Sequence, residues 1–157
     1  QDLVWQDLVW QDLDQANNVP DNVMMWLDDK ESLTAKLKQK FDDFAVNVLS
    51  QTQKKPHTNE SDVLGFEGGS IIREVELLGN GEVMVFARSV IPVNDDTNDL
   101  LLIGSKPLGE MLFNNPNIQR GKLQITHTGN VWGRRSVFSI GRTKLLVSEF
   151  FLEILYA

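Results

Sequence analysis

The sequence predicts a single α+β domain built mainly on an antiparallel β-sheet. Successive β-rich runs are joined by short turns, and helical patterns are grouped before and between these runs. The 157 residues, of which 41% are hydrophobic and 24% are charged, are typical of one globular domain that buries a core without crosslinks.

The N-terminus is repetitive. The pentad Gln1–Trp5 recurs at Gln6–Trp10 and then in part up to Gln15. Copies this short are unlike structural repeats, which usually span about twenty residues or more. We therefore treat residues 1–18 as an atypical segment without an assigned function, and residues 19–157 as the domain.

Two helices and a strand are expected next. One helix follows Pro20, and Ser32 can cap a second that runs to about Phe41, because Leu33, Leu37 and Phe41 recur at the spacing of one helical face. Phe44–Leu49 has the composition of a strand, and the polar stretch from 51 to 62 is typical of a loop.

The second half of the chain repeats this mixture. Asp95–Ile103 and Leu108–Phe113 are expected to be short helices, separated by a turn at Lys106–Gly109. The remaining strands are expected at Lys122–Thr128, Arg134–Ile140 and Leu145–Leu152.

A hairpin predicted between these regions determines how two arginines, Arg73 and Arg88, lie relative to each other. The β-rich runs on either side of Asn80–Gly81 predict a two-residue turn, because Asn-Gly is the strongest short hairpin signal. The facing pairs would then be Gly79 with Glu82, Leu77 with Met84, Val75 with Phe86, and Arg73 with Arg88.

Two like charges facing each other on an apolar face destabilise a hairpin, so Arg73 and Arg88 require an anion. A protein carboxylate could supply it, but Glu74 and Glu76 would point to the opposite face of the strand. The other candidate is a ligand with carboxylates, which guanidinium groups bind through paired hydrogen bonds.

Glu149 is the second unusual residue, because it interrupts an apolar strand and a buried carboxylate needs a partner. A two-residue turn at Gly141–Arg142 would place it opposite Arg134, and a loop one residue longer would place it opposite Arg135. It is either half of a structural ion pair or a carboxylate that exchanges a proton with a bound ligand.

Other classes of function have little support. The net charge of -7 argues against nucleic-acid binding and against an anionic membrane surface. The chain has no cysteine, His127 lacks neighbours at metal-ligand spacing, and no phosphate-binding loop or nucleophile motif occurs. No apolar run is long enough to span a bilayer and no signal peptide is recognisable, so we expect a cytoplasmic protein.

A set of short segments, taken together, resembles the chorismate lyase family. The 15-residue spacing of Arg73 and Arg88 belongs to this set. The segments occur in family order at Glu31–Thr34, Ile72–Glu74, Asn80–Glu82, Ala87–Val93, Lys106–Gly109, Leu112–Phe113, Trp132–Ser136 and Leu145–Leu152.

The resemblance implies a role for five residues. Arg73 would bind the carboxylate of the aromatic product, and Arg88 would suit the enolpyruvyl carboxylate. Leu33 and Leu108 would touch the ligand, largely through their backbones, and Glu149 would meet the hydroxyl at the far end of the ring.

The resemblance also implies a fold and a reaction. The fold is an antiparallel sheet with helical flaps over a buried ligand pocket, the flaps lying near Leu33 and Leu108. The reaction converts chorismate to 4-hydroxybenzoate and pyruvate for ubiquinone biosynthesis. It forms an aromatic ring and needs no metal or redox cofactor, so the expected partners are small molecules bound by a monomer.

Two departures from the family pattern stand near this site. Leu33 replaces a methionine of the best-known member, a change between residues of similar volume. Glu110 replaces a basic residue and places an acid near a site for anions. The alternative function is that of a non-catalytic, effector-sensing domain with the same fold, although the acidic N-terminal residues are too few for a DNA-binding winged helix.

Overall fold

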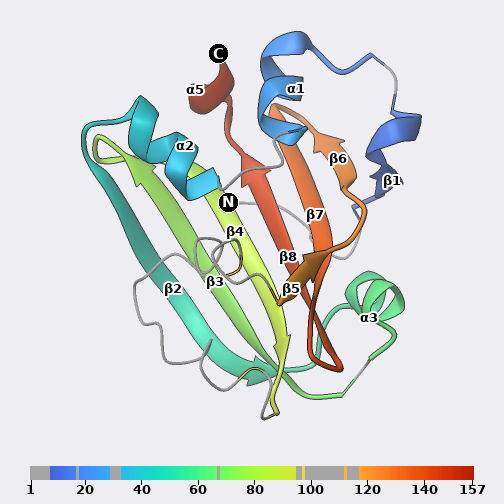
Figure 1. Ribbon diagram of the computed structural model, residues 1–157. Helices are drawn as coiled ribbons and strands as arrows, with labels where there is room; N and C mark the ends of the chain where they lie inside the picture. Colours follow the sequence, from blue (N-terminus) through green and yellow to red (C-terminus); the bar gives the residue numbers. More distant parts are fainter. Residues whose placement is uncertain are drawn as a thin grey trace.

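The strands of the computed structural model form one open antiparallel sheet, which confirms the predicted α+β class. The structure describes residues 8–16, 18–28, 33–66, 68–94, 97, 112 and 117–157. Within this part of the chain the sheet has eight strands in the order β1-β6-β7-β8-β4-β3-β2, and β5 pairs with β7 (Figure 1). The strands are β1 (Gln11–Asp12), β2 (Phe44–Lys54), β3 (Ser70–Gly79), β4 (Glu82–Pro92), β5 (Ile118–Arg120), β6 (Gln124–Thr128), β7 (Val131–Ile140) and β8 (Thr143–Phe151).

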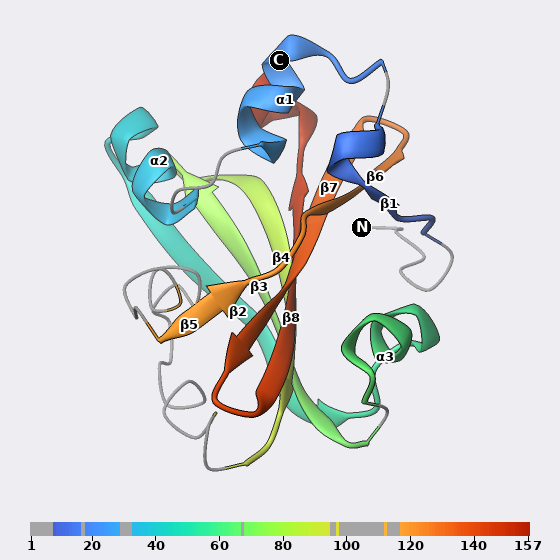
Figure 2. The same ribbon diagram turned by 45° about the vertical axis from the view of Figure 1, so that its right-hand side comes forward.

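Helices cover both faces of this sheet. Figure 2 shows α2 and α3 on opposite sides of it, with α1 near α2. The described helices are α1 (Asp21–Leu27), α2 (Leu33–Lys40), α3 (Thr58–Leu64) and α5 (Glu153–Tyr156), and a 3₁₀ turn occupies Leu13–Gln15. None of these helices has the length and apolar composition that crossing a bilayer requires.

The hydrophobic core identifies the two faces. On the face that we call the α1/α2 face, Val75, Ala87 and Phe151 pack in one cluster with buried residues of α1 and α2. On the opposite face, the α3 face, Ile72 and Leu146 pack with residues of α3. Side chains of the central strands therefore point to one of these two faces.

The hairpin of β3 and β4 has the predicted turn but not the predicted register. Asn80 and Gly81 both have positive φ angles, 52° and 85°, and Gly79 pairs with Glu82. The pairing then shifts, because Leu78 faces Val83 and Leu77 faces Val85. The strand β4 thus carries one extra residue, Met84, as a β-bulge.

The bulge makes the predicted pairing of Arg73 with Arg88 wrong. Arg73 faces Ser89, and Arg88 faces Glu74. A shift of one residue moves every side chain that follows to the other face of the sheet. The two arginines consequently lie on opposite faces, and the predicted pairs of Leu77 with Met84 and Val75 with Phe86 are wrong for the same reason.

The second hairpin has the predicted register. Ile140 pairs with Thr143, so Gly141 and Arg142 form a two-residue turn, and Glu149 faces Arg134. The helices expected after Pro20 and Ser32 correspond to α1 and α2, whereas Ser32 itself lies outside the described residues. The helices expected at 95–103 and 108–113 also lie largely outside them.

The polar stretch from 51 to 62 is not the predicted loop. Its first residues extend β2 to Lys54, where Gln51–Lys54 pairs with Ser70–Arg73, and its last residues belong to α3. Both elements lack a strong hydrophobic period, because β2 is an exposed edge strand and α3 begins with polar residues. The N-terminal repeat also contributes to the sheet, since Gln11 pairs with Ile125.

Candidate functional site

Arg73 lies on the α1/α2 face in the middle of β3. Its side chain is buried, with 2% of the residue exposed, and its Nη1 donates a hydrogen bond of 2.9 Å to Oε1 of Gln51 on the edge strand β2. Burial lowers the pKa of Arg73, but an arginine still carries its charge at neutral pH. Gln51 therefore orients a buried cation through a neutral amide. The sequence analysis missed this role because it expected a loop, rather than a strand, at Gln51.

Glu149 lies on the same face and pairs with Arg134, as the two-residue turn predicts. Nε of Arg134 donates to Oε1 of Glu149 at 2.8 Å, and 13% of the Glu149 side chain is exposed. Arg134 is 1% exposed, and its Nη1 also donates to the carbonyl oxygens of Trp26 and Leu27 at 3.0 and 3.4 Å. Arg134 thus connects the carboxylate on the sheet to the last turn of α1.

The register places Arg73 and Glu149 two strands and two residues apart. Arg73 lies in one row with Ser89, and Glu149 lies in the row of Ala87. With strands about 4.8 Å apart and a rise of about 3.3 Å per residue, their backbones are separated by roughly 10 Å across the sheet and 7 Å along it. This spacing is sufficient for a ligand of about one ring with a polar group at each end.

The helices α1 and α2 form the described cover of this face. Leu33, at the start of α2, is buried in the core cluster that includes residues of α1 and of the sheet. Nζ of Lys36 donates to the carbonyl oxygen of Met25 at 2.6 Å and lies 4.3 Å from the ring centroid of Trp26, which joins the two helices. The other predicted contact, Leu108, lies outside the described residues, as does Glu110.

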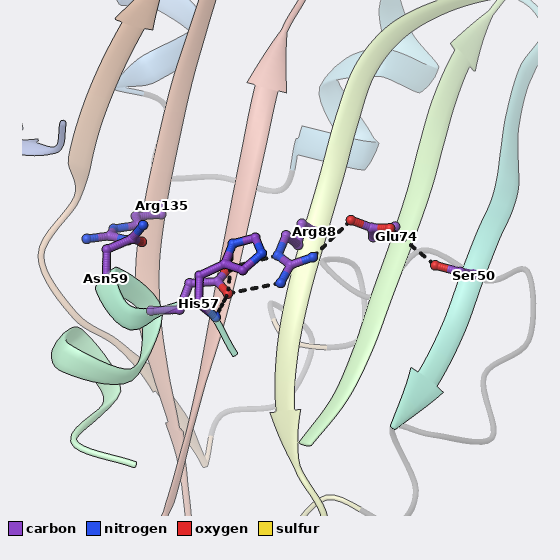
Figure 3. A network of polar contacts seen from close by, with 7 residues as sticks. Ser50, His57, Asn59, Glu74, Arg88 and Arg135 are labelled. Atoms are coloured by element: carbon purple, nitrogen blue, oxygen red, sulfur yellow. Dashed lines mark hydrogen bonds and ion pairs between the residues drawn. The ribbon is translucent and has the colours of Figure 1, made fainter. Parts of the chain in front are cut away.

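Arg88 is directed to the α3 face, where the protein itself supplies its anions (Figure 3). Its Nε and Nη2 donate to the two carboxylate oxygens of Glu60 at 2.8 and 3.0 Å, and its Nη1 donates to Glu74 at 3.0 Å. The bulge at Met84 brings Arg88 to the face of Glu74. The structure therefore does not bring Arg88 together with Arg73 or Glu149.

The charges of this cluster stabilise one another. Burial alone would raise the pKa of Glu60, but the hydrogen bonds and the charge of Arg88 hold it below the usual value. Burial would lower the pKa of Arg88, and the two carboxylates raise it instead. Burial and the nearby Arg88 lower the pKa of His57, whose backbone N–H donates to Glu60 at 2.9 Å. Sequence reasoning missed Glu60 because it stands in the polar stretch.

No metal centre accompanies either set of charges in the part of the chain that the structure describes, since it contains no group of three or more His, Cys, Asp or Glu side chains arranged to hold an ion. His127 stacks on Trp132 with ring centroids 3.9 Å apart, a packing role. The described polar groups of the α1/α2 face include a buried cation, a carboxylate and hydrogen-bonding groups under a helical cover.

Comparison with solved structures relates this fold to that of a regulator. The chain is similar to a possible transcriptional regulator, YydK, from Bacillus subtilis, with a TM-score of 0.55 and 11% sequence identity. The match covers 81% of this chain and 65% of the other, so the chain spans less than two thirds of that protein's length. At this identity the likeness concerns the fold alone.

Sequence comparisons are more specific. Three relatives, each named "Probable chorismate pyruvate-lyase", come from Aromatoleum aromaticum, Thiobacillus denitrificans and Pseudomonas putida, with identities of 36%, 32% and 37%. The matches cover 85%, 91% and 83% of this chain and 86%, 89% and 81% of the relatives. The sequence model of the family described as chorismate lyase matches residues 4–157. The chain therefore belongs to the chorismate lyase family of lyases.

Proposed function

We propose that the protein removes pyruvate from chorismate and forms 4-hydroxybenzoate, the aromatic acid that enters ubiquinone biosynthesis. The names of the relatives support the substrate and the reaction. The structural observation that carries the proposal is the presence of Arg73 and Glu149 on one covered face of the sheet, at a separation that suits a ring with polar groups at both ends.

The proposed binding mode assigns one end of the ring to each residue. The guanidinium of Arg73, oriented by Gln51, holds the ring carboxylate. Oε1 of Glu149 accepts the hydrogen bond of Arg134, and Oε2 meets the ring hydroxyl. Leu33 contacts the ligand from the start of α2, and Arg88 has no part in this binding mode because it faces Glu60 and Glu74 on the other side.

The reaction needs positioning and a path for a proton. A proton leaves ring C4, the ether bond at ring C3 breaks, and the electron pair of the C–H bond completes the aromatic ring. The departing enolpyruvate takes up a proton at its methylene carbon and becomes pyruvate. In our hypothesis Glu149 assists the departure of the ether oxygen with a shared proton; in the alternative, the proton moves within the substrate and Glu149 only orients it.

A direct assay tests the activity. The purified chain is incubated with chorismate, 4-hydroxybenzoate is followed by its absorbance, and pyruvate is followed by lactate dehydrogenase and NADH. We expect both products in equal amounts, at a rate above that of chorismate alone. Saturable binding of 4-hydroxybenzoate without any turnover would contradict the proposal and would favour an effector-binding domain of the same fold.

The amide of Gln51 provides a sharper test of where the substrate carboxylate binds. The change Gln51→Glu places a carboxylate where the amide oxygen now lies, 2.9 Å from Arg73. We expect the KM for chorismate to rise about tenfold, equivalent to about 1.4 kcal/mol, because the new carboxylate competes for the guanidinium. The turnover number kcat should change much less.

Gln53→Glu is the matched control for this change. Gln53 lies on the same strand and faces Ile71, two pairs along the ladder from Gln51 and Arg73, so its side chain is on the same face as that of Gln51. It adds an equal charge without reaching the guanidinium, so its KM should stay within about twofold of the unmodified protein, as for a weakly interacting surface charge. Equal changes in both variants would place the substrate carboxylate elsewhere.

A further inference from the structure

A pocket lies on the α3 face, close to the edge of the sheet that is opposite β2. Its volume is about 210 Å³, below the range of about 300–1,000 Å³ that holds drug-sized ligands, so it suits a small molecule. The residues around it combine polar and apolar side chains: Asp12, Val63, Lys122, Gln124, Arg135, Ser136, Val137 and Leu146.

Arg135 is the buried cation of this pocket, with only 6% of the residue exposed. Its Nε donates to Oε1 of Gln124 and its Nη1 to Oδ1 of Asn59, each at 2.8 Å, and the ring centroid of Trp10 lies 4.4 Å from its Cζ. Asn59 comes from α3 and approaches the guanidinium from the helix side (Figure 3). The guanidinium is therefore held in one orientation by three neutral groups.

The partners of Arg135 differ from those of Arg88 and Arg134. Arg88 binds Glu60 and Glu74, and Arg134 binds Glu149, whereas among the described residues no carboxylate pairs with Arg135. Nη2 of Arg135 forms no hydrogen bond with this part of the chain. Burial lowers the pKa of Arg135 to about 10, although the charge of Glu60 acts in the other direction. Among the described residues, Arg135 is thus a preorganised cation with no carboxylate within ion-pair distance.

The rest of the pocket indicates which anion would fit. The side chains of Val63, Val137 and Leu146 supply an apolar wall that continues the core of the α3 face. Lys122 and Asp12 have opposite formal charges, so Arg135 leaves the pocket with one net positive charge. A monoanion with a compact apolar body matches both properties, whereas an inorganic polyanion would leave the apolar wall uncovered.

We propose that this pocket binds a small organic monocarboxylate. The carboxylate accepts hydrogen bonds from Nη2 of Arg135, and the apolar body of the ligand lies against Val137 and Leu146. The site is separate from Arg73 and Glu149, which lie on the opposite face of the sheet. It does not depend on the activity proposed above, because the pocket and its cation are described without reference to that reaction.

Nuclear magnetic resonance of the ¹⁵N-labelled chain, residues 1–157, tests this site, with benzoate as the probe. The reporters are the Nε–H of Arg135 and the side-chain amides of Gln124 and Asn59. We expect their resonances to shift with one common, saturable dissociation constant. The side-chain amide of Gln51 reports on the opposite face in the same titration, so binding at Arg73 is recorded separately.

Neutral benzamide, which has nearly the same shape, should leave the Arg135 reporters unchanged. Arg135→Gln should weaken benzoate binding at Asn59 and Gln124 at least tenfold, whereas Arg142→Gln, which removes an exposed arginine of the β7–β8 turn, should leave it unchanged. Shifts that do not saturate, equal shifts with benzamide, or undiminished binding in Arg135→Gln would each overturn the proposal. The comparison of benzoate with benzamide needs no variant, so it holds even if Arg135→Gln does not fold.

Discussion

Replacing Glu149 by glutamine is expected to lower the kcat for chorismate by about a hundredfold or more, since general acid–base catalysis contributes roughly 10²–10⁴-fold. The amide oxygen of glutamine can still accept the hydrogen bond that Nε of Arg134 donates at 2.8 Å, so the local structure should be kept. What the variant loses is the carboxylate that can share a proton. Steady-state kinetics with purified protein measure the effect.

Two further variants separate this role from binding. Arg73→Ala should act mainly through a higher KM, because Arg73 is assigned to the substrate carboxylate. Glu153→Gln removes an exposed carboxylate of α5 and should leave both constants unchanged. Near-normal turnover in Glu149→Gln would remove Glu149 as an obligatory acid, and the proton would then move within the substrate.

Replacing Glu60 by glutamine is expected to destabilise the protein by about 3 kcal/mol at neutral pH, because breaking a buried ion pair leaves a buried charge without compensation. Glu60 is 5% exposed and binds Arg88 through both carboxylate oxygens. Glu74 would remain as a partner of Arg88, which places the cost at the lower end of the range for buried pairs. Urea unfolding followed by circular dichroism measures the difference.

The free energy of unfolding of Glu60→Gln should fall less in acid than that of the unmodified protein. The pKa of Glu60 in the folded protein lies below its value of 4.5 in a model compound. The stabilisation by its ionised form is therefore complete above the unfolded pKa and is lost as the pH falls through the folded pKa. The difference in unfolding free energy between the two proteins should shrink from about pH 5 downward.

Glu76→Gln is the control for both measurements on Glu60. Glu76 accepts a hydrogen bond from Asn47 at the exposed side of β3 and has no buried arginine as a partner in the described structure. Its replacement should change stability by no more than about 0.5 kcal/mol, as for most surface substitutions. A loss as large as that of Glu60→Gln would mean that overall charge, rather than the buried pair, determines the effect.

The two hairpins illustrate how far the sequence predicts this site. Glu149 and Arg134 face each other as expected, because the turn at Gly141–Arg142 has two residues and the strands continue without interruption. The turn at Asn80–Gly81 is also as predicted. The bulge at Met84, however, moves each later residue of β4 to the face opposite to the predicted one.

A bulge depends on neighbours that local patterns do not contain. The carbonyl oxygen of Met84 accepts a hydrogen bond from the backbone N–H of Leu152, which follows the distant strand β8. The shifted register also places the small Ala87, rather than Phe86, beside Glu149 on the α1/α2 face. Both of these contacts join parts of the chain that are far apart in the sequence, and local patterns do not record them.

The helix α3 escaped prediction for a related reason. Its sequence resembles a polar loop, and its buried carboxylate has its partner 28 residues further along the chain. Composition describes the local preference of such a segment, whereas a buried ion pair is decided by the fold. Arg88 and Glu60 could be recognised as partners only after the strands had been placed.

Arg134 connects the last turn of α1 to Glu149 on the sheet through its hydrogen bonds. If α1 moved away, Nη1 would lose the carbonyl oxygens of Trp26 and Leu27, whereas Nε would keep its hydrogen bond to Glu149. The hydrogen bonding of Glu149 and the position of α1 are consequently linked through Arg134. Such a coupling is reciprocal. A movement of α1 changes the interaction free energy of Glu149 by the same amount by which a change at Glu149 alters the stability of the α1 position. A ligand that changes the hydrogen bonds of Glu149 would thereby also change how firmly α1 is held on the sheet.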